Sequence, residues 1–132
     1  MIPNAIPEAV IPVSNLGRAI EFYRDTVGLE VVQRYDLPQS PMVRFSTGGD
    51  ATVLVYESVG AGQSRATVAG FVVGDIDAAV EELRGRGVTF EEYDMGELKT
   101  ENGIVRFNGI AGAWFKDPDG NILGIGSYEV AT

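Results

Sequence analysis

The chain has 132 residues, a net charge of −9, 45% hydrophobic residues, and neither cysteine nor histidine. This length and composition predict one compact soluble domain, and no apolar run is long enough for a membrane-spanning helix. The lack of cysteine excludes disulfides, thiolate metal sites and a cysteine nucleophile, and is compatible with a cytoplasmic location. The lack of histidine removes the usual near-neutral general base and the commonest metal ligand. The acidic balance disfavours nucleic acid and membrane surfaces as partners. It is explained either by solubility alone or by attraction of a cationic ligand.

The first predicted strand covers residues 7–13, PEAVIPV. Glu8 lies at its start, on the same side of the strand as Val10 and Pro12. A carboxylate in this position has three interpretations: a metal ligand, an anion within a binding site, or an ordinary solvent-exposed residue near a strand end. The sequence leaves all three open.

An internal repeat follows. Residues 13–32, VSNLGRAIEFYRDTVGLEVV, have a near-copy in residues 73–92, VGDIDAAVEELRGRGVTFEE. Both read as strand, cap, helix, glycine and strand, so the chain contains a duplicated unit. Helix caps and terminal glycines are expected at matching places: Ser14 or Asn15 and Gly28 in the first copy, and Asp75 and Gly87 in the second.

Strand candidates follow each helix. They lie at 29–35, 41–47 and 51–58 in the first unit, and at 88–93, 103–108, 111–117 and 121–128 in the second. The turn DPDG, residues 117–120, has a purely local explanation, since proline sets the turn and glycine adopts a positive φ. We predict an α+β fold of two βαβββ modules in one domain, 1–132. The modules cover about 5–58 and 67–128, joined by a linker at about 59–66.

Two stretches, residues 11–32 and WFKDPDGNILGI at 114–125, together with the repeat, resemble the vicinal oxygen chelate superfamily. That superfamily includes glyoxalase I, extradiol dioxygenases and the bleomycin-resistance proteins. The resemblance implies an eight-stranded mixed sheet with helices on one face and a concave cup on the other. It also implies a homodimer whose cups are completed across the two subunits.

Metal-binding members of the superfamily use four inward-pointing ligands, usually His or Glu, from the first and last strands of each module. By resemblance, the positions here are Glu8, Leu54 (or Val55), Val68 and Gly124. Because three of the four carry no donor side chain, we expect no metal ligand set, no divalent metal and no other cofactor.

The resemblance also implies which residues face the cup. The expected ligand-binding residues are Glu8, Thr52, Leu54, Tyr56, Trp114 and Gly124. Glu8 is the only catalytic candidate. Trp114 can form a wall of the cup, although a tryptophan in a strand more often belongs to the core. Arg44 and Arg106 lie between apolar residues, where they can pair with Glu8 or an anionic ligand group, or point into solvent. Residues 93–103 are expected to form a mobile polar rim.

The leading functional hypothesis is a metal-independent binder of a small organic molecule, as in drug sequestration, with a preference for cationic ligands. The alternative is a metal-dependent lyase, isomerase or dioxygenase of the same superfamily. Whether the chain catalyses a reaction is left undecided by the sequence.

Overall fold

The computed structural model describes residues 4–96 and 98–128. The first module contains β1 (Ala9–Val13), α1 (Leu16–Glu21), a π-helical turn η1 (Phe22–Thr26), β2 (Glu30–Tyr35), β3 (Met42–Ser46) and β4 (Thr52–Glu57). Its four strands form one sheet in the order β1-β4-β3-β2, with β1 parallel to β4.

The second module contains β5 (Thr67–Val72), α2 (Ile76–Gly85), β8 (Val105–Phe107), β9 (Ile110–Lys116) and β10 (Ile122–Tyr128). Its sheet has the order β5-β10-β9-β8, with β5 parallel to β10. A short hairpin of β6 (Asp94–Met95) and β7 (Leu98–Lys99) precedes β8. The two modules therefore share one topology, and the predicted α+β fold of two βαβββ units is confirmed.

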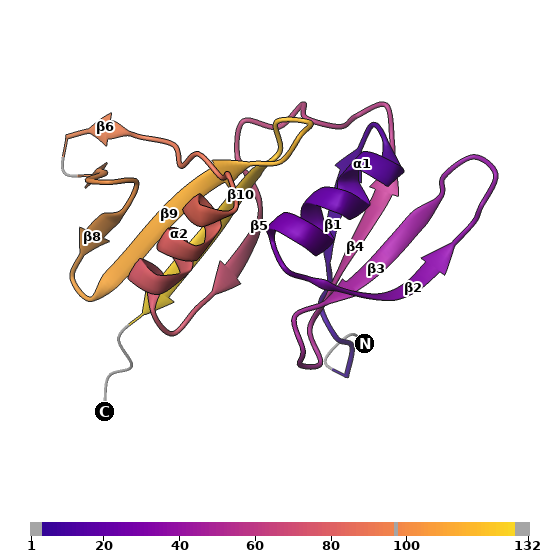
Figure 1. Ribbon diagram of the computed structural model, residues 1–132, viewed down its shortest axis with the longest axis horizontal. Helices are drawn as coiled ribbons and strands as arrows, with labels where there is room; N and C mark the ends of the chain where they lie inside the picture. Colours follow the sequence, from indigo (N-terminus) through magenta and orange to yellow (C-terminus); the bar gives the residue numbers. More distant parts are fainter. Residues whose placement is uncertain (1–3, 97, 129–132) are drawn as a thin grey trace.

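Backbone hydrogen bonding divides the eight principal strands into two four-stranded sheets, which lie side by side with β1 and β5 next to each other. Figure 1 shows α1 and α2 on the same side of their sheets, so the opposite face of each sheet is left open. The expected mixed sheet is thus present as two halves, each with one helix packed on it.

The predicted helix ends are also found. The Asn15 side chain accepts a hydrogen bond from the Arg18 amide at 2.9 Å, and Asp75 accepts one from the Ala78 amide at 3.1 Å. Gly28 and Gly87 follow the helices with φ of 91° and 94°, a region that glycine adopts without steric cost. Of the two candidate caps in the first module, Asn15 is the one that caps the helix.

One predicted strand is wrong. Residues 88–93 form a single β-bridge, between Phe90 and Phe115, and one further backbone bond from the Glu91 amide to the Trp114 carbonyl. The reason is that β9 has one free edge, since β10 occupies the other. That free edge is shared between this segment at its carboxyl end and β8 at its amino end.

The expected polar rim at 93–103 includes the β6–β7 hairpin and one well-anchored residue. Thr100 is buried, and its hydroxyl donates to Glu92 Oε2 at 2.7 Å and accepts from the Tyr93 amide at 2.8 Å. These bonds join the two ends of the β6–β7 hairpin.

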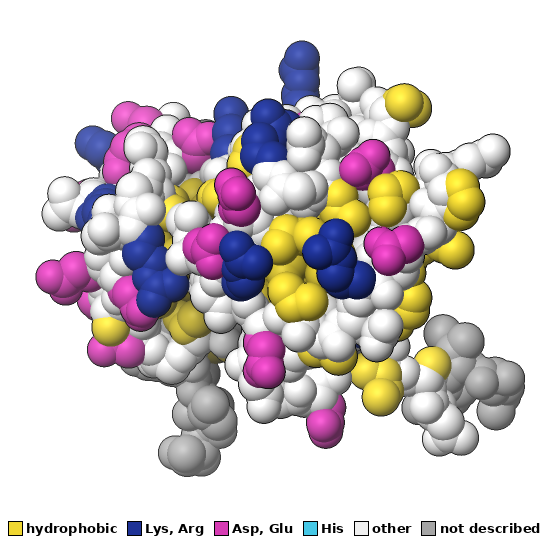
Figure 2. Space-filling view, turned by 45° about the vertical axis from the view of Figure 1, so that its right-hand side comes forward, with side chains coloured by type: hydrophobic (Ala, Val, Ile, Leu, Met, Phe, Trp, Pro, Cys, Tyr) yellow, Lys and Arg dark blue, Asp and Glu magenta, His cyan; other side chains and the backbone are white. Residues whose placement is uncertain are grey.

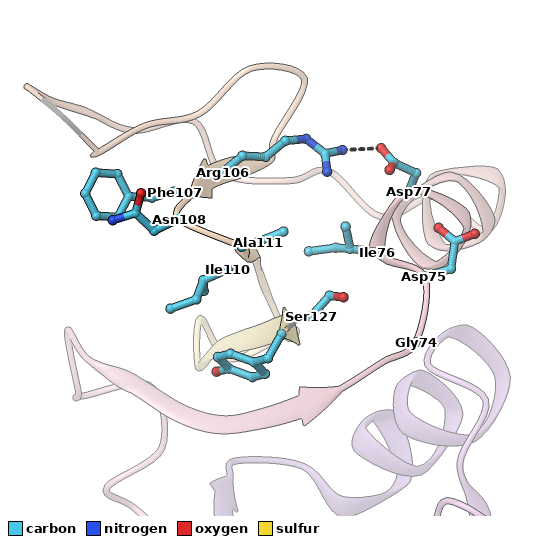
Figure 3. Close-up of a pocket in the computed structure, with 12 residues that line it drawn as sticks. Gly74, Asp75, Ile76, Asp77, Arg106, Phe107, Asn108, Ile110, Ala111 and Ser127 are labelled. Carbon is cyan, nitrogen blue, oxygen red and sulfur yellow. Dashed lines mark hydrogen bonds and ion pairs between the residues drawn. The ribbon is translucent and has the colours of Figure 1, made fainter. Parts of the chain in front are cut away.

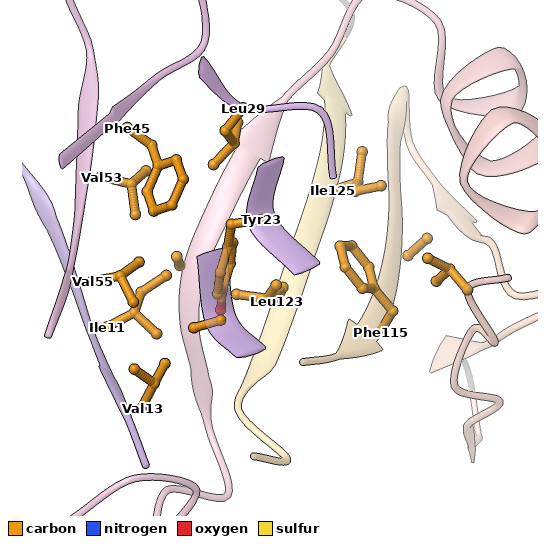
Figure 4. Close-up of a cluster of buried hydrophobic side chains, with 14 of the residues drawn as sticks. Ile11, Val13, Tyr23, Leu29, Phe45, Val53, Val55, Phe115, Leu123 and Ile125 are labelled. Atoms are coloured by element: carbon orange, nitrogen blue, oxygen red, sulfur yellow. The ribbon is translucent and has the colours of Figure 1, made fainter. Parts of the chain in front are cut away.

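A single hydrophobic core joins the two modules. Strand alternation decides which residues enter it: Val53 and Val55 are buried beneath α1, whereas Thr52, Leu54 and Tyr56 lie on the open face and are half-buried. Figure 4 shows Tyr23 between the aliphatic side chains of the first module and Leu123 and Phe115 of the second. The core therefore determines how the two modules sit together.

Exposed hydrophobic side chains gather near the middle of the face drawn in Figure 2, with acidic and basic side chains interspersed around them.

None of the helices in the described part of the chain is both long and apolar enough to cross a membrane.

Candidate functional site

Glu8 lies immediately before β1, and its carboxylate is bound by side chains from two neighbouring strands. Arg44 of β3 donates to it through two nitrogens, Nε to Oε2 at 2.6 Å and Nη2 to Oε1 at 3.1 Å. Thr52 of β4 donates its hydroxyl to Oε2 at 2.6 Å. The strand order β1-β4-β3 brings these three side chains together on the open face of the first sheet.

These contacts determine the charge of Glu8. The Arg44 guanidinium and then the Thr52 hydroxyl hold the pKa of the Glu8 carboxyl below its usual range. The same ion pair raises the pKa of Arg44. Because a general base works best with a pKa near the operating pH, an ionised Glu8 with its oxygens already bonded is poorly suited to proton abstraction. It is well suited to holding Arg44 in one orientation.

Arg44 also contacts Tyr35 of β2. Its Nη1 lies 2.5 Å from the Tyr35 hydroxyl, and its guanidinium carbon lies 5.4 Å from the centre of the Tyr35 ring. Of the alternatives left open for Arg44, pairing with Glu8 is the one found. Tyr35 was not predicted as a site residue. It could have been found from alternation on the neighbouring strand, had the pairing of β2 with β3 been known.

Leu54 and Tyr56 extend this surface along β4. They are in register with Val10 and Pro12 of β1, and both are half-buried on the open face. Among the hydrogen bonds of the described residues, none uses the Tyr56 hydroxyl. The first sheet thus presents an apolar strip next to one fixed ion pair and a phenol hydroxyl.

On the second sheet, Trp114 lies over glycines of its own strand and of β10. A Cβ built on Gly112 would be 3.2 Å from the indole carbon Cη2, and one on Gly124 would be 3.3 Å from Nε1. The space above Gly124 is therefore filled by the indole. Tyr93 packs edge-on against the same indole, with ring centres 5.7 Å apart.

Tyr128 has the same relationship to Gly126, where an added Cβ would be 3.1 Å from the phenol oxygen. Trp114 and Tyr128 therefore each cover a glycine of β10, and neither residue is fully buried. Gly112 was not predicted as a site residue. Gly112 lies two residues before Trp114 in the same strand, and residues two apart share a strand face. This spacing could have indicated that the indole covers Gly112.

The residues present do not fit the metal site of the superfamily. Glu8 has both carboxylate oxygens bonded to Arg44 or Thr52, and Leu54, Val68 and Gly124 have no donor side chain. Within residues 4–96 and 98–128, no group of three or more acidic side chains is arranged as metal ligands would be. The donor set at these positions therefore cannot supply the three or four ligands that a transition-metal site needs.

A hollow of about 650 Å³ lies at the end of the second module, between the start of α2 and the β8–β9 turn. Figure 3 shows its charged side chains, with Arg106 paired to Asp77. Asp75 is used by the helix cap. Arg106 therefore pairs across this hollow and takes no part in the Glu8 cluster.

Two comparisons with known proteins bear on the family of this chain. The model of the Glyoxalase/Bleomycin resistance protein/Dioxygenase superfamily matches residues 5–125. No curated protein sequence matches the chain.

Several solved structures share the fold. One is TnmS3, an antibiotic binding protein from Streptomyces sp. CB03234, with 22% identity, 95% of this chain and 98% of that chain covered, and a TM-score of 0.69. A glyoxalase family protein from Enterococcus faecalis is 21% identical, with 96% and 99% covered and a TM-score of 0.72. A glyoxalase/bleomycin resistance protein/dioxygenase from Alicyclobacillus acidocaldarius is 20% identical, with 97% and 94% covered and a TM-score of 0.69.

The family match spans nearly the whole chain, and the two-module fold agrees with it. The chain belongs to the Glyoxalase/Bleomycin resistance protein/Dioxygenase superfamily.

Proposed function

We propose that this chain binds a small organic molecule, such as a drug that it sequesters, on the open faces of its two sheets and without a metal ion. The observation that carries the proposal is the Glu8–Arg44–Thr52 cluster, in which the acid at the one donor-bearing ligand position is bonded to protein groups. An acid bonded in this way serves recognition better than it serves metal binding.

The surface around the cluster has the character of a recognition site. Small-molecule sites are mostly apolar and contain a few well-placed polar groups. Here Leu54 and Val10 supply apolar area, and Tyr56 and Arg44 supply donors. On the second sheet, the partly exposed indole of Trp114 offers a flat surface for a ring to stack on.

A cation is the favoured ligand charge in this proposal. The net charge of −9 attracts cations over long range, and most of the acidic side chains are exposed. The likeness to TnmS3, described as an antibiotic binding protein, agrees with a role in sequestration. We place this activity in the cytoplasm.

The proposal includes a homodimer. Val10 and Val72 are large apolar residues of β1 and β5 that alternate away from the helix side, and they are 49% and 76% exposed. A second copy covering these faces would remove apolar surface from water and would close the open side of each site. Sedimentation of the purified chain tests this step.

The binding test uses two planar dyes of opposite charge, proflavine (cationic) and anthraquinone-2-sulfonate (anionic). Trp114 is the only tryptophan, so quenching of its fluorescence reports ligand close to the second sheet. We expect saturable binding that is tighter for proflavine, unchanged by EDTA, and weakened in Tyr56→Ala. Val59→Ala, at a fully exposed position outside the strands, is the matched control and should bind as the wild type does.

The enzyme alternative predicts a different result. Stoichiometric bound iron, zinc, nickel or manganese that is lost in Glu8→Ala would overturn the proposal in favour of metal-dependent catalysis. Binding that requires added metal would have the same meaning.

A further inference from the structure

A cleft of about 710 Å³ lies between the two modules on the side of the sheets that carries the helices. From the strands, its lining includes Val53 of β4, Phe71 of β5 and Ile125 of β10. Leu29, which follows the first helix, and Leu83 of α2 also line it. These side chains are mostly apolar and come from both modules. The volume falls within the range of roughly 300–1,000 Å³ that is typical of small-molecule sites.

This cleft is separate from the proposed cup. Val53, Phe71 and Ile125 alternate with the open-face residues of their strands, so they point to the helix side. Glu8, Arg44, Tyr56 and Trp114 of the cup do not line the cleft, whereas Thr52 does. A molecule in the cleft and a molecule in the cup would therefore contact largely different sets of side chains, with Thr52 at the border of both.

The cleft is open because the modules are tied together elsewhere. Tyr23 donates to Asp117 Oδ2 at 2.7 Å, and Asn121 Nδ2 donates to the Pro12 carbonyl at 2.7 Å. Both contacts involve the last residues of β1 or the turn before β10. The cleft lies beside the start of β1 and the end of β5. In the part of the chain that the structure describes, these two strands share no backbone ladder, because β1 pairs with β4 and β5 pairs with β10.

Two charged groups lie at the end of α2 where it borders the cleft, Glu82 in the helix and Arg86 directly after it, and they neutralise each other. Arg86 Nη2 lies 2.9 Å from Glu82 Oε1, and Arg86 Nη1 lies 3.4 Å from the Asp25 carbonyl. The Arg86 guanidinium thus spans from α2 to the first module. A paired arginine adds hydrogen-bond donors without a net charge, so this border suits an uncharged ligand that carries one acceptor atom.

We propose that the cleft is a second small-molecule site, which takes an uncharged, largely apolar compound with a carbonyl oxygen directed to Arg86. The apolar lining supplies most of the affinity, because binding removes both the compound and the cleft walls from water. This site does not depend on the cup having a ligand.

The test is a titration with Nile red, an uncharged dye that has a carbonyl group and fluoresces strongly in apolar surroundings. Ala79 lines the cleft from α2, whereas its neighbour Ala78 faces solvent. Ala79→Phe fills the cleft and Ala78→Phe adds the same ring outside it. We expect a Kd at least about tenfold higher in Ala79→Phe than in Ala78→Phe or the wild type. Val27→Phe fills the cleft from the first module and should reproduce the effect if Ala79→Phe fails to fold.

Equal binding of Nile red by the wild type, Ala78→Phe and Ala79→Phe would overturn the proposal. A lack of Nile red binding by the wild type would overturn it as well. Loss of dye binding in Tyr56→Ala with no loss in Ala79→Phe would also overturn it, because that result places the dye in the cup. Failure of the cup proposal is distinguishable: proflavine would then not bind, while Nile red would still bind the wild type and not Ala79→Phe.

Discussion

Tyr23 and Asp117, which lie 94 residues apart in the chain, are joined by a hydrogen bond of 2.7 Å from the phenol hydroxyl to Oδ2. Both residues are buried, and they belong to different modules. Asn121 donates to the same carboxylate oxygen at 2.8 Å and to the Pro12 carbonyl at 2.7 Å. The turn at 117–120 therefore joins the modules, in addition to its local role.

Removal of the Tyr23 hydroxyl should destabilise the chain. Burial and the neighbouring Asp117 raise the pKa of Tyr23, so the phenol remains a donor across the working pH range. Tyr23→Phe leaves Asp117 with its Asn121 bond but removes one bond to a buried charge, at a cost of about 1–3 kcal/mol in the free energy of unfolding. Urea denaturation measures this. Tyr56→Phe is the matched control and should change stability by less than about 0.5 kcal/mol. Equal effects of the two substitutions would contradict the proposed tie between modules.

Glu8 should make stability depend on pH. Its pKa is lower in the folded chain than in the unfolded chain, where it is about 4.3, so its stabilisation is present above that pH and is lost as the pH falls through the folded pKa. Wild type should therefore be more stable than Glu8→Gln near neutral pH, and the difference should shrink below about pH 4. Urea denaturation at several pH values measures the difference. Glu81→Gln, at an exposed position of α2, is the matched control. A Glu8→Gln difference that stays constant with pH would contradict the ion pair.

A methyl group at Gly124 should displace the Trp114 indole. An alanine Cβ would lie 3.3 Å from Nε1 and from Thr67 Cγ2, which is closer than most such contacts. We expect Gly124→Ala to shift the tryptophan emission and to cost about 1–3 kcal/mol, as overpacking does. Gly49→Ala is the control, because nothing lies within 4 Å of its added Cβ. An unchanged emission spectrum in Gly124→Ala would mean that the indole does not lie over this glycine.

A methyl group at Gly62 should weaken the contact between the linker and the turn that joins the modules. Its φ is 71°, and an added Cβ would lie 2.1 Å from the Asp119 carbonyl oxygen. Gly62→Ala should cost more than about 2 kcal/mol in thermal or urea unfolding, since both the backbone and the contact are strained. Gly60→Ala, whose Cβ would make only an ordinary contact, should be nearly neutral. Similar losses in the two variants would show that the linker does not pack on the turn.

The sequence by itself determined the local structure. Asn15 and Asp75 cap helices because their side chains reach backbone amides three residues away, and Gly28 and Gly87 adopt positive φ at the helix ends. Side chains alternate along β4, so that Val53 and Val55 are buried and their neighbours are not. The resemblance, combined with this alternation, predicted that Leu54 and Tyr56 lie on the open face, as they do. These features depend on neighbours within a few residues, so a pattern can show them.

Only the tertiary structure decided the partners of the charged and polar groups. Arg44 and Thr52 are 36 and 44 residues from Glu8, and they meet its carboxylate because β4 lies between β1 and β3 in a particular register. Asp117 meets Tyr23 because the modules share one core. Such contacts depend on strand order and on how the modules pack, and neither is written in the spacing of residues along a single strand or turn.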